Sequence, residues 1–372
     1  MEDMVMEKCF NNIYKDKVVL VTGHTGFKGS WLTIWLELLG AKVIGYSLEP
    51  NTNPSLFKVC ELENDIVSII GDIRDEKNLH SVIEKYKPEI VFHMAAQPLV
   101  RDSYENPKET YEINVMGCIS LFEAIRKTKS VKTIVNITTD KCYENKEWVY
   151  GYRENDPMGG YDPYSSSKAC VELLTNSYRK SFFEDKGVEI STVRAGNVIG
   201  GGDWAKDRLI PDIAKSIISN NDICIRNPNA IRPWQHVLEP LSGYLWLGAL
   251  MIEGNNNYSD GWNFGPESVD ILSVKEILDL TIEIWGRGSY ALDLSNNVHE
   301  ANLLKLDISK AKSKLGWRPL YNSNQAIAET VEWYKTYYQD SNINMKKFTI
   351  NQIKKYVKYA EKSNIIWSGS ND

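Results

Sequence analysis

The chain has 372 residues, 42% hydrophobic and 25% charged, which is ordinary for a soluble globular protein of about two domains. Its formal net charge of −6 argues against a general phosphate-binding surface, and so against a nucleic-acid partner. The longest apolar runs are far shorter than the roughly 20 residues that cross a bilayer, so we expect no membrane partner.

Apolar strands alternate with amphipathic helices through the first half of the chain. The strand at 17–22 runs directly into a glycine loop, and apolar residues then recur at three- and four-residue steps until Gly40. Such alternation predicts an α/β fold, a Rossmann-type doubly wound parallel sheet with helices on both faces. The expected strands are 17–22, 42–46, 65–70, 89–94, 131–138 and 189–194, and the expected helices are 27–38, 76–86, 107–129 and one that begins at 163.

The glycine loop between the first strand and the first helix predicts a dinucleotide site. Gly23, Gly26 and Gly29 permit a tight turn, close approach of the backbone to a pyrophosphate and close helix packing, and the helix N-terminus supplies free amides. A structural turn without a ligand is the alternative. We expect the cofactor contacts to come from Gly23, Thr25, Gly26, Phe27, Gly29, Ser47, Asp72, Ile73, Ala95, Ala96, Tyr164 and Lys168.

The end of the second strand bears on which dinucleotide binds. The sequence there is Tyr46-Ser47-Leu48, without the acid that binds a ribose hydroxyl in NAD sites, and the nearest acid is Glu49. There is also no arginine for a 2′-phosphate, and the absence of that arginine favours NAD over NADP. Asp72 either accepts a hydrogen bond from the adenine amino group or caps the next helix.

Tyr164 and Lys168 are one helical turn apart and therefore project from the same face of a helix. Asp162 and Pro163 suit the cap and the first position of that helix. Thr139 follows the fifth strand, at the edge of the sheet where ligands of doubly wound folds bind. We expect Thr139 to hold a substrate hydroxyl while Tyr164, its pKa lowered by Lys168 and the cationic nicotinamide, removes the proton.

The regular alternation stops near Gly196. We expect residues 1–195 to form the Rossmann domain, with a segment near 237–265 returning to it, and residues 196–372 to form mainly a smaller C-terminal substrate-binding lobe and a helical tail. The six cysteines include no Cys-x-x-Cys pair and the N-terminus has no secretion signal, so we expect a cytoplasmic protein with reduced thiols and no metal.

Five motifs can be read along the chain: Gly23-His-Thr-Gly-Phe-Lys-Gly-Ser-Trp-Leu32, His93-Met-Ala-Ala-Gln97, Thr139-Asp-Lys-Cys-Tyr143, Tyr164-x-x-x-Lys168 and Arg232-Pro-Trp-Gln-His236. Together they resemble those of the extended short-chain dehydrogenase/reductases, and within them the nucleotide-sugar 4,6-dehydratases. The resemblance covers nearly the whole chain. In several related dehydratases the threonine is followed by Asp-Glu, whereas here it is followed by Asp140-Lys141.

The resemblance implies a redox-neutral dehydration of a nucleotide-sugar. NAD takes hydride from C4 of the hexose, water leaves across C5 and C6, and the hydride returns to C6. Asp140 is the candidate general acid for the departing C6 hydroxyl. Lys141 acts at the same elimination, as base if its amine is desolvated and otherwise as an orienting cation.

The resemblance also implies substrate contacts and an assembly. Arg208 and Arg232 are the leading clamps for the diphosphate, although each alone is equally compatible with a surface salt bridge. The family further implies a homodimer or homotetramer, and motif likeness favours cytosine as the base. The remaining expected substrate contacts are Asn197, Gln97 and Ser103, while Asn114 is expected to brace the backbone of the site.

Three alternatives stay open. A nucleotide-sugar 4-epimerase shares the glycine loop and Tyr-x-x-x-Lys but needs no acid and base for elimination, so Asp140-Lys141 favours a dehydratase. A dehydratase for another nucleotide-hexose is the second alternative. A non-catalytic dinucleotide sensor is the third, but it has no need of Thr139, Tyr164 and Lys168 together.

Overall fold

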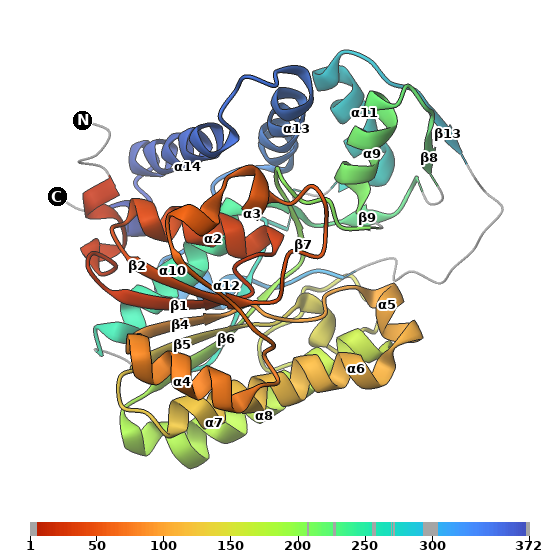
Figure 1. Ribbon diagram of the computed structural model, residues 1–372. Helices are drawn as coiled ribbons and strands as arrows, with labels where there is room; N and C mark the ends of the chain where they lie inside the picture. The colour runs from red at the N-terminus through yellow and green to blue at the C-terminus, as the bar shows by residue number, and fades with distance from the viewer. Residues whose placement is uncertain are drawn as a thin grey trace.

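The computed structural model describes residues 6–206, 208–225, 228–254, 258–268, 270, 272–292 and 304–369. Its centre is a seven-stranded sheet in the order β11-β6-β5-β4-β1-β2-β3 (Figure 1), and all neighbouring strands are parallel. The predicted doubly wound parallel fold is therefore confirmed. The strands are β1 (Val18–Thr22), β2 (Lys42–Ser47), β3 (Val67–Ile70), β4 (Ile90–His93), β5 (Thr133–Ile137), β6 (Glu189–Ala195) and β11 (Gly261–Phe264).

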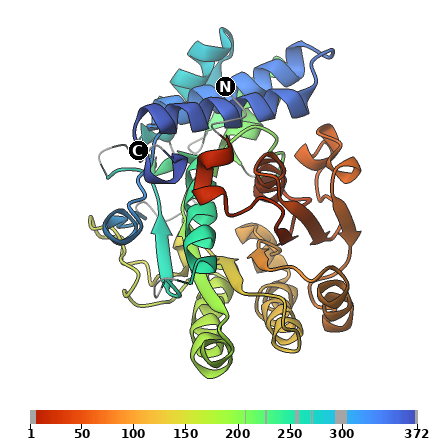
Figure 2. The same ribbon diagram turned by 90° about the vertical axis from the view of Figure 1, so that its left-hand side faces the viewer.

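Helices cover both faces of this sheet because its inner strands are apolar on both sides. In β1, Val19 and Val21 pack into one buried cluster and Leu20 into another. Figure 2 shows three helices seen nearly end-on beneath the sheet. The helices on the Leu20 side are α4 (Glu76–Tyr86), α7 (Gly117–Arg126) and α8 (Pro163–Tyr178), and those on the other side are α2 (Phe27–Leu38) and α10 (Leu238–Ile252).

The helix expected over 107–129 is interrupted. It consists of α6 (Pro107–Tyr111), the π-helical segment η3 (Glu112–Met116) and α7, which ends at Arg126. Gly117 follows the π segment, and a Cβ there would lie 2.6 Å from Cγ2 of Ile73. The wider turn shifts the helix surface so that Asn114 points to the loop after β4, as described below.

The chain returns to the sheet through α10 and β11, and the remaining elements lie outside the sheet, with α12 packed against β11. In Figure 1, α9, α11, β8 and β13 lie together at one end of the molecule, while α14 lies beside α2. These elements are β7 (Asn197–Ile199), α9 (Leu209–Ile218), β8 (Ile223–Ile225), β9 (Ile231–Arg232), β10 (Trp234–His236), β12 (Leu272–Ser273), α11 (Val274–Trp285), β13 (Tyr290–Leu292), α12 (Ser309–Leu315), α13 (Ser323–Gln339) and α14 (Met345–Lys362).

Short helices fill the connections. The first and last of them pack together, since the rings of Phe10 in η1 and Trp367 in η7 are stacked with centroids 5.0 Å apart. Among the described residues, no helix has the length and apolarity of a bilayer span. The short helices are η1 (Cys9–Asn12), α3 (Leu56–Val59), η2 (Leu62–Asn64), α5 (Val100–Glu105), η4 (Asp140–Cys142), η5 (Arg179–Phe183), η6 (Glu184–Lys186) and η7 (Ile366–Ser368).

Isoleucine side chains in the inner strands of the sheet are more deeply buried than those at its edge. Ile134 in β5 is fully buried, whereas Ile70 at the end of the edge strand β3 is 47% exposed. We expect Ile134→Ala to lower the free energy of unfolding by about 2–5 kcal/mol, because it leaves a cavity in the core. Ile70→Ala makes the same chemical change and should cost less than about 1 kcal/mol. Denaturant unfolding of both variants measures the difference, and equal losses would contradict it.

Candidate active site

The site lies where the carboxyl ends of parallel strands meet. Strands β1, β4, β5 and β6 are adjacent and parallel, so the loops that follow them come to one edge of the sheet. The hydroxyl of Thr22 at the end of β1 accepts hydrogen bonds from the amides of Met94 (3.1 Å) and Ala95 (3.2 Å) after β4. These bonds fix the glycine loop against the next loop.

The glycine loop is sterically closed around two of its glycines. Gly23 has φ +77°, and a Cβ there would lie 2.7 Å from the amide nitrogen of Ala95. At Gly29 a Cβ would lie 2.1 Å from the carbonyl oxygen of Gly23. At Gly26 the nearest atom would be 3.4 Å away, so the fold itself leaves room for a methyl group there. Packing within the protein therefore does not explain why residue 26 is a glycine. The close approach of a pyrophosphate to the backbone does explain it.

The end of β2 carries hydroxyl groups. The Thr25 hydroxyl donates to the carbonyl oxygen of Leu48 (2.8 Å) and lies 2.9 Å from Oγ of Ser47. Both hydroxyls thus meet where a ribose is expected. His24 turns away from the loop: its ring bonds the Ser68 hydroxyl (2.7 Å), and burial lowers its pKa to about 4.

Asp72 does not cap the next helix, because Asp75 caps α4 by accepting from the amide of Asn78 (3.0 Å). The Asp72 carboxylate instead accepts from the backbone amide and the guanidinium of Arg74, and this contact lowers the pKa of Asp72. The capping alternative is wrong, and the adenine alternative stays a prediction. Ile73 is buried against Gly117 rather than open to solvent.

Four polar residues after β5 and on α8 converge in a buried position: Thr139, Asp140, Tyr164 and Lys168 are all at least nine-tenths buried. The helix begins as predicted, with Asp162 accepting from the amide of Ser165 (2.9 Å). The Thr139 side chain lies near the Tyr164 phenol, where it acts to lower the pKa of the phenol, and its hydroxyl donates to Asp140 (3.0 Å). The phenol thus lies close to the loop that carries Asp140.

In the protein without a ligand, the pKa of Tyr164 is raised and not lowered. Burial raises its pKa to about 12, against the opposing effects of the Thr139 side chain and of Arg208. The Lys168 amine donates to the carbonyl oxygen of Ile137 (3.1 Å), and burial lowers its own pKa to about 8. Desolvation therefore outweighs any effect of Lys168 on the phenol.

Asp140 and Lys141 occupy different environments. The Asp140 side chain is 4% exposed and the Lys141 side chain 38%, and their charged atoms are 3.9 Å apart. Gly196 makes room for the carboxylate, since a Cβ there would lie 3.1 Å from Oδ2 of Asp140. A cavity of about 280 Å³, lined in part by Gly196 and Pro233, opens beside this point.

The expected substrate residues are not equally accessible. The Gln97 side chain is bonded to Leu99 in its own loop and to Thr110 in α6. Ser103 is fully buried and donates to the carbonyl oxygen of Val100 (2.6 Å). Asn114 braces the loop as expected: it accepts from the amide of Gln97 (2.8 Å) and donates to its carbonyl oxygen (3.1 Å).

The expected phosphate-binding residues lie in the smaller lobe. Asn197 begins β7, and Arg208 precedes α9 with its Nε 4.0 Å from Oδ2 of Asp203. Arg232 is in β9, but its side chain lies outside the described part of the structure. Within that described part, no group of three or more His, Cys, Asp and Glu side chains is arranged to hold a metal ion.

Lys28 is a site residue that the sequence prediction missed. It lies in the first turn of α2, and burial lowers its pKa to about 8. Arg208 and Lys168 lower this pKa further, whereas Asp140 and Asp203 raise it, so the amine lies among the charged groups of the site. Its position between Gly26 and Gly29, in the first turn of the helix, was the available signal.

Comparison with known proteins places these features in a family. The model of the GDP-mannose 4,6 dehydratase family matches residues 20–330. The CDP-glucose 4,6-dehydratase of Salmonella typhimurium is 54% identical over 332 residues, which cover 88% of this chain and 92% of that protein.

Solved structures share the fold. The UDP-glucose 4-epimerase of Stenotrophomonas maltophila, with bound NAD and formylated UDP-arabinopyranose, aligns with a TM-score of 0.76 and 21% identity over 87% of this chain and 100% of that one. The dTDP-glucose 4,6-dehydratase of Streptomyces venezuelae, with NAD bound, aligns with a TM-score of 0.72 and 22% identity. The alignment covers 86% of this chain and 97% of that one.

The loop glycines allow a test that separates packing from ligand binding. We expect Gly29→Ala to destabilise the protein by about 1–3 kcal/mol, because the methyl group overlaps the backbone of Gly23. Gly26→Ala should leave the thermal unfolding midpoint of the ligand-free protein unchanged but weaken NAD binding, because the methyl group lies where the pyrophosphate approaches. Calorimetric titration with NAD measures the second effect, and undiminished affinity of Gly26→Ala would contradict the dinucleotide site.

Proposed function

Because the chain belongs to the GDP-mannose 4,6 dehydratase family of extended short-chain dehydrogenase/reductases, we propose that it is an NAD-dependent CDP-glucose 4,6-dehydratase. This hydro-lyase converts CDP-glucose to CDP-4-dehydro-6-deoxyglucose and water, a step of deoxysugar biosynthesis. The observation that carries the proposal is the convergence of Thr139, Asp140, Tyr164 and Lys168 at one buried point in a chain closely similar to the Salmonella enzyme.

The residues of the glycine loop fit NAD. Gly23 and Gly26 expose backbone at the N-terminus of α2, and the hydroxyls of Thr25 and Ser47 lie where the adenosine ribose is expected. When bound, NAD supplies a hydride acceptor that later returns the hydride, so the overall reaction is redox-neutral. Gly23, Gly26, Thr25 and Ser47 thus hold the cofactor, and the reaction requires no other oxidant.

Tyr164 takes the proton of the C4 hydroxyl, which is held by Thr139. The phenol has a pKa of about 12 in the protein alone, so positive charge must be added near it before it can act as a base. The cationic nicotinamide ring of bound NAD would add that charge, next to Lys168, whose amine the carbonyl oxygen of Ile137 holds in place. The phenolate is therefore formed only when cofactor and substrate are in place.

Asp140 and Lys141 carry out the elimination. The C4 ketone makes the C5 proton acidic; Lys141 accepts this proton as the C5–C6 double bond forms, and Asp140 donates a proton to the C6 oxygen, which leaves as water. The Lys141 side chain is 38% exposed, so its amine can reach the bound hexose. Hydride added at C6 and a proton at C5 complete the product.

The smaller lobe binds the nucleoside diphosphate through Arg208, Arg232 and Asn197, since guanidinium groups bind phosphate oxygens in bidentate fashion. The chain assembles as a homodimer or homotetramer through α7 and α8. Exposed apolar side chains support this assembly: Met116, directly before α7, is 53% exposed, and Leu173 in α8 is 62% exposed.

The product assay tests the function. With NAD and CDP-glucose, the purified protein should release the 4-keto-6-deoxy sugar, and it should act far more slowly on the dTDP-, UDP- and GDP-hexoses. Tyr164→Phe should lower the rate by about 10²–10⁴, because no group replaces the phenol as base. A reaction with only another nucleotide's sugar would refute the CDP assignment.

The same assay separates the proposal from a 4-epimerase, the other activity that shares the glycine loop and Tyr164. An epimerase would return CDP-galactose with its C6 hydroxyl retained. The buried Asp140 beside Lys141 favours elimination, because epimerisation needs neither group.

Lys141 has a role that can be isolated by half-reactions. We expect Lys141→Ala to oxidise C4, seen as reduced nicotinamide absorbance, but to form no keto-deoxy sugar. Lys141→Arg is the matched variant: it keeps a positive charge yet cannot accept the C5 proton, so it should fail in the same step. Normal dehydration by Lys141→Ala would refute the role, and substantial elimination by Lys141→Arg would show that a fixed cation suffices.

A further inference from the structure

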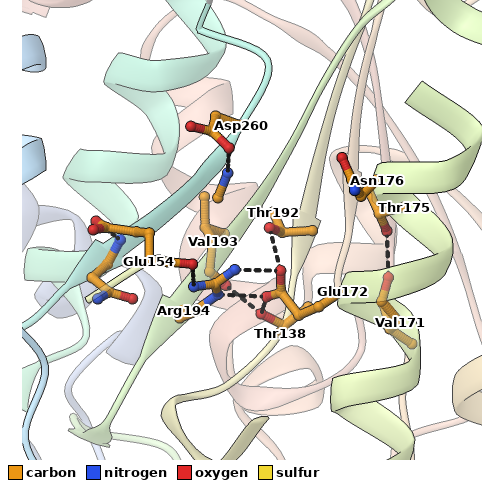
Figure 3. A network of polar contacts seen from close by, with 12 residues as sticks. Thr138, Glu154, Val171, Glu172, Thr175, Asn176, Thr192, Val193, Arg194 and Asp260 are labelled. Atoms are coloured by element: carbon orange, nitrogen blue, oxygen red, sulfur yellow. Dashed lines mark hydrogen bonds and ion pairs between the residues drawn. The ribbon is translucent and has the colours of Figure 1, made fainter. Parts of the chain in front are cut away.

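A buried ion pair joins α8, the helix of Tyr164 and Lys168, to β6 (Figure 3). Glu172 in α8 and Arg194 in β6 are joined by two hydrogen bonds, from Nε to Oε1 (2.8 Å) and from a terminal nitrogen to Oε2 (2.7 Å), and each side chain is 4% exposed. Burial alone would raise the pKa of Glu172, but Arg194 lowers it. Both groups are therefore charged.

The carboxylate has two further donors. The hydroxyl of Thr138 donates to Oε1, and the hydroxyl of Thr192 donates to Oε2 at 2.6 Å. Thr138 directly precedes Thr139, whereas Thr192 lies within β6. Glu172 lies four residues after Lys168 and eight after Tyr164 on the same face of α8. One carboxylate thus joins the catalytic helix to the start of the loop that carries Asp140 and Lys141.

The guanidinium holds the other end of that loop. A terminal nitrogen of Arg194 donates to the hydroxyl of Tyr143 (2.5 Å) and to the carbonyl oxygen of Glu154 (3.0 Å). The Tyr143 hydroxyl donates in turn to Asn263 of β11 (2.8 Å). Tyr143 comes two residues after Lys141, so the ion pair contacts the loop on both sides of its catalytic residues.

The chain is shaped around the arginine. A Cβ at Gly261 in β11 would lie 2.5 Å from a terminal nitrogen of Arg194, so glycine there leaves the space that the guanidinium fills. A buried ion pair is seldom more stabilising than apolar side chains of similar volume. The ion pair does, however, impose a fixed geometry, because the planar guanidinium and the carboxylate fix the positions of the donors and acceptors around them.

We propose that Glu172 and Arg194 are positioning residues that hold Asp140 and Lys141 at a fixed place relative to Tyr164 and Lys168. The inference rests on the proposed dehydration. The ion pair touches neither substrate nor cofactor; it acts through Thr138 on one side of the catalytic loop and through Tyr143 on the other. The elimination, which depends on that loop, should be more sensitive to its loss than the C4 oxidation, which depends on Tyr164 and Lys168 in α8.

Two matched pairs of variants test this role without leaving a buried charge unpaired. Thr138→Val and Thr192→Val each remove one hydroxyl donor from Glu172, but only Thr138 adjoins the catalytic loop. Tyr143→Phe and Tyr152→Phe each remove one hydroxyl from a pair of stacked rings 5.1 Å apart, but only the Tyr143 hydroxyl bonds Arg194. Similar losses of thermal stability are expected within each pair.

The readout is the amount of reduced nicotinamide on the enzyme relative to keto-deoxy sugar released during turnover of CDP-glucose. We expect Thr138→Val and Tyr143→Phe to accumulate reduced nicotinamide as elimination slows by about 10- to 100-fold, the scale of a misplacement of about 1 Å. Thr192→Val and Tyr152→Phe should keep the ratio of the unaltered protein, since loss of folded protein alone slows both steps equally.

Two failures are distinguishable. If the unaltered protein forms no keto-deoxy sugar from CDP-glucose, the proposed function is wrong. If it does, and the four variants keep its ratio of reduced nicotinamide to product, the positioning role of Glu172 and Arg194 is refuted and the ion pair serves the fold alone.

Discussion

Parallel pairing of β1, β4, β5 and β6 is the constraint on which the site depends, because it brings the loops after these strands to one edge of the sheet. The Thr22 hydroxyl then joins two of those loops through the amides of Met94 and Ala95. The Glu172–Arg194 ion pair joins a third loop to α8. Residues distant in sequence thus meet through a few directional bonds, while apolar contacts on both faces hold the sheet itself.

Burial has opposite effects on the ionisable groups at this edge. It lowers the pKa values of Lys28 and Lys168 to about 8, and it raises that of Tyr164 to about 12. In all three side chains, loss of contact with water on burial favours the neutral form over the charged one. A base such as Tyr164 is therefore inactive until a ligand changes the charge around it, which couples proton transfer to the presence of substrate and cofactor.

Much of this arrangement could be predicted from the sequence because the signals are local. The periodicity of α2 and α4, the cap at Asp162 and the spacing of Tyr164 and Lys168 each depend on neighbouring residues. The doubly wound parallel sheet followed from the alternation of strands and helices.

The features that were missed depend on contacts between distant segments. The π-helical turn at η3 is followed by Gly117, which lies against Ile73, 44 positions earlier. The helix cap that was one of two alternatives for Asp72 is provided by Asp75. Arg194 and Glu172 are an ordinary arginine and glutamate in sequence and acquire their role only when β6 lies against α8. Burial of Ser103 is likewise decided by tertiary packing.

The stacked rings of Phe10 and Trp367 have a topological consequence. They bring η1 and η7 into contact, and a Cβ at Gly369 would lie 2.7 Å from the carbonyl oxygen of Lys8. A short covalent bridge between these two regions would close the polypeptide into a ring with little distortion. New ends opened at an exposed surface loop would then give a circularly permuted protein with the same sheet and the same catalytic edge.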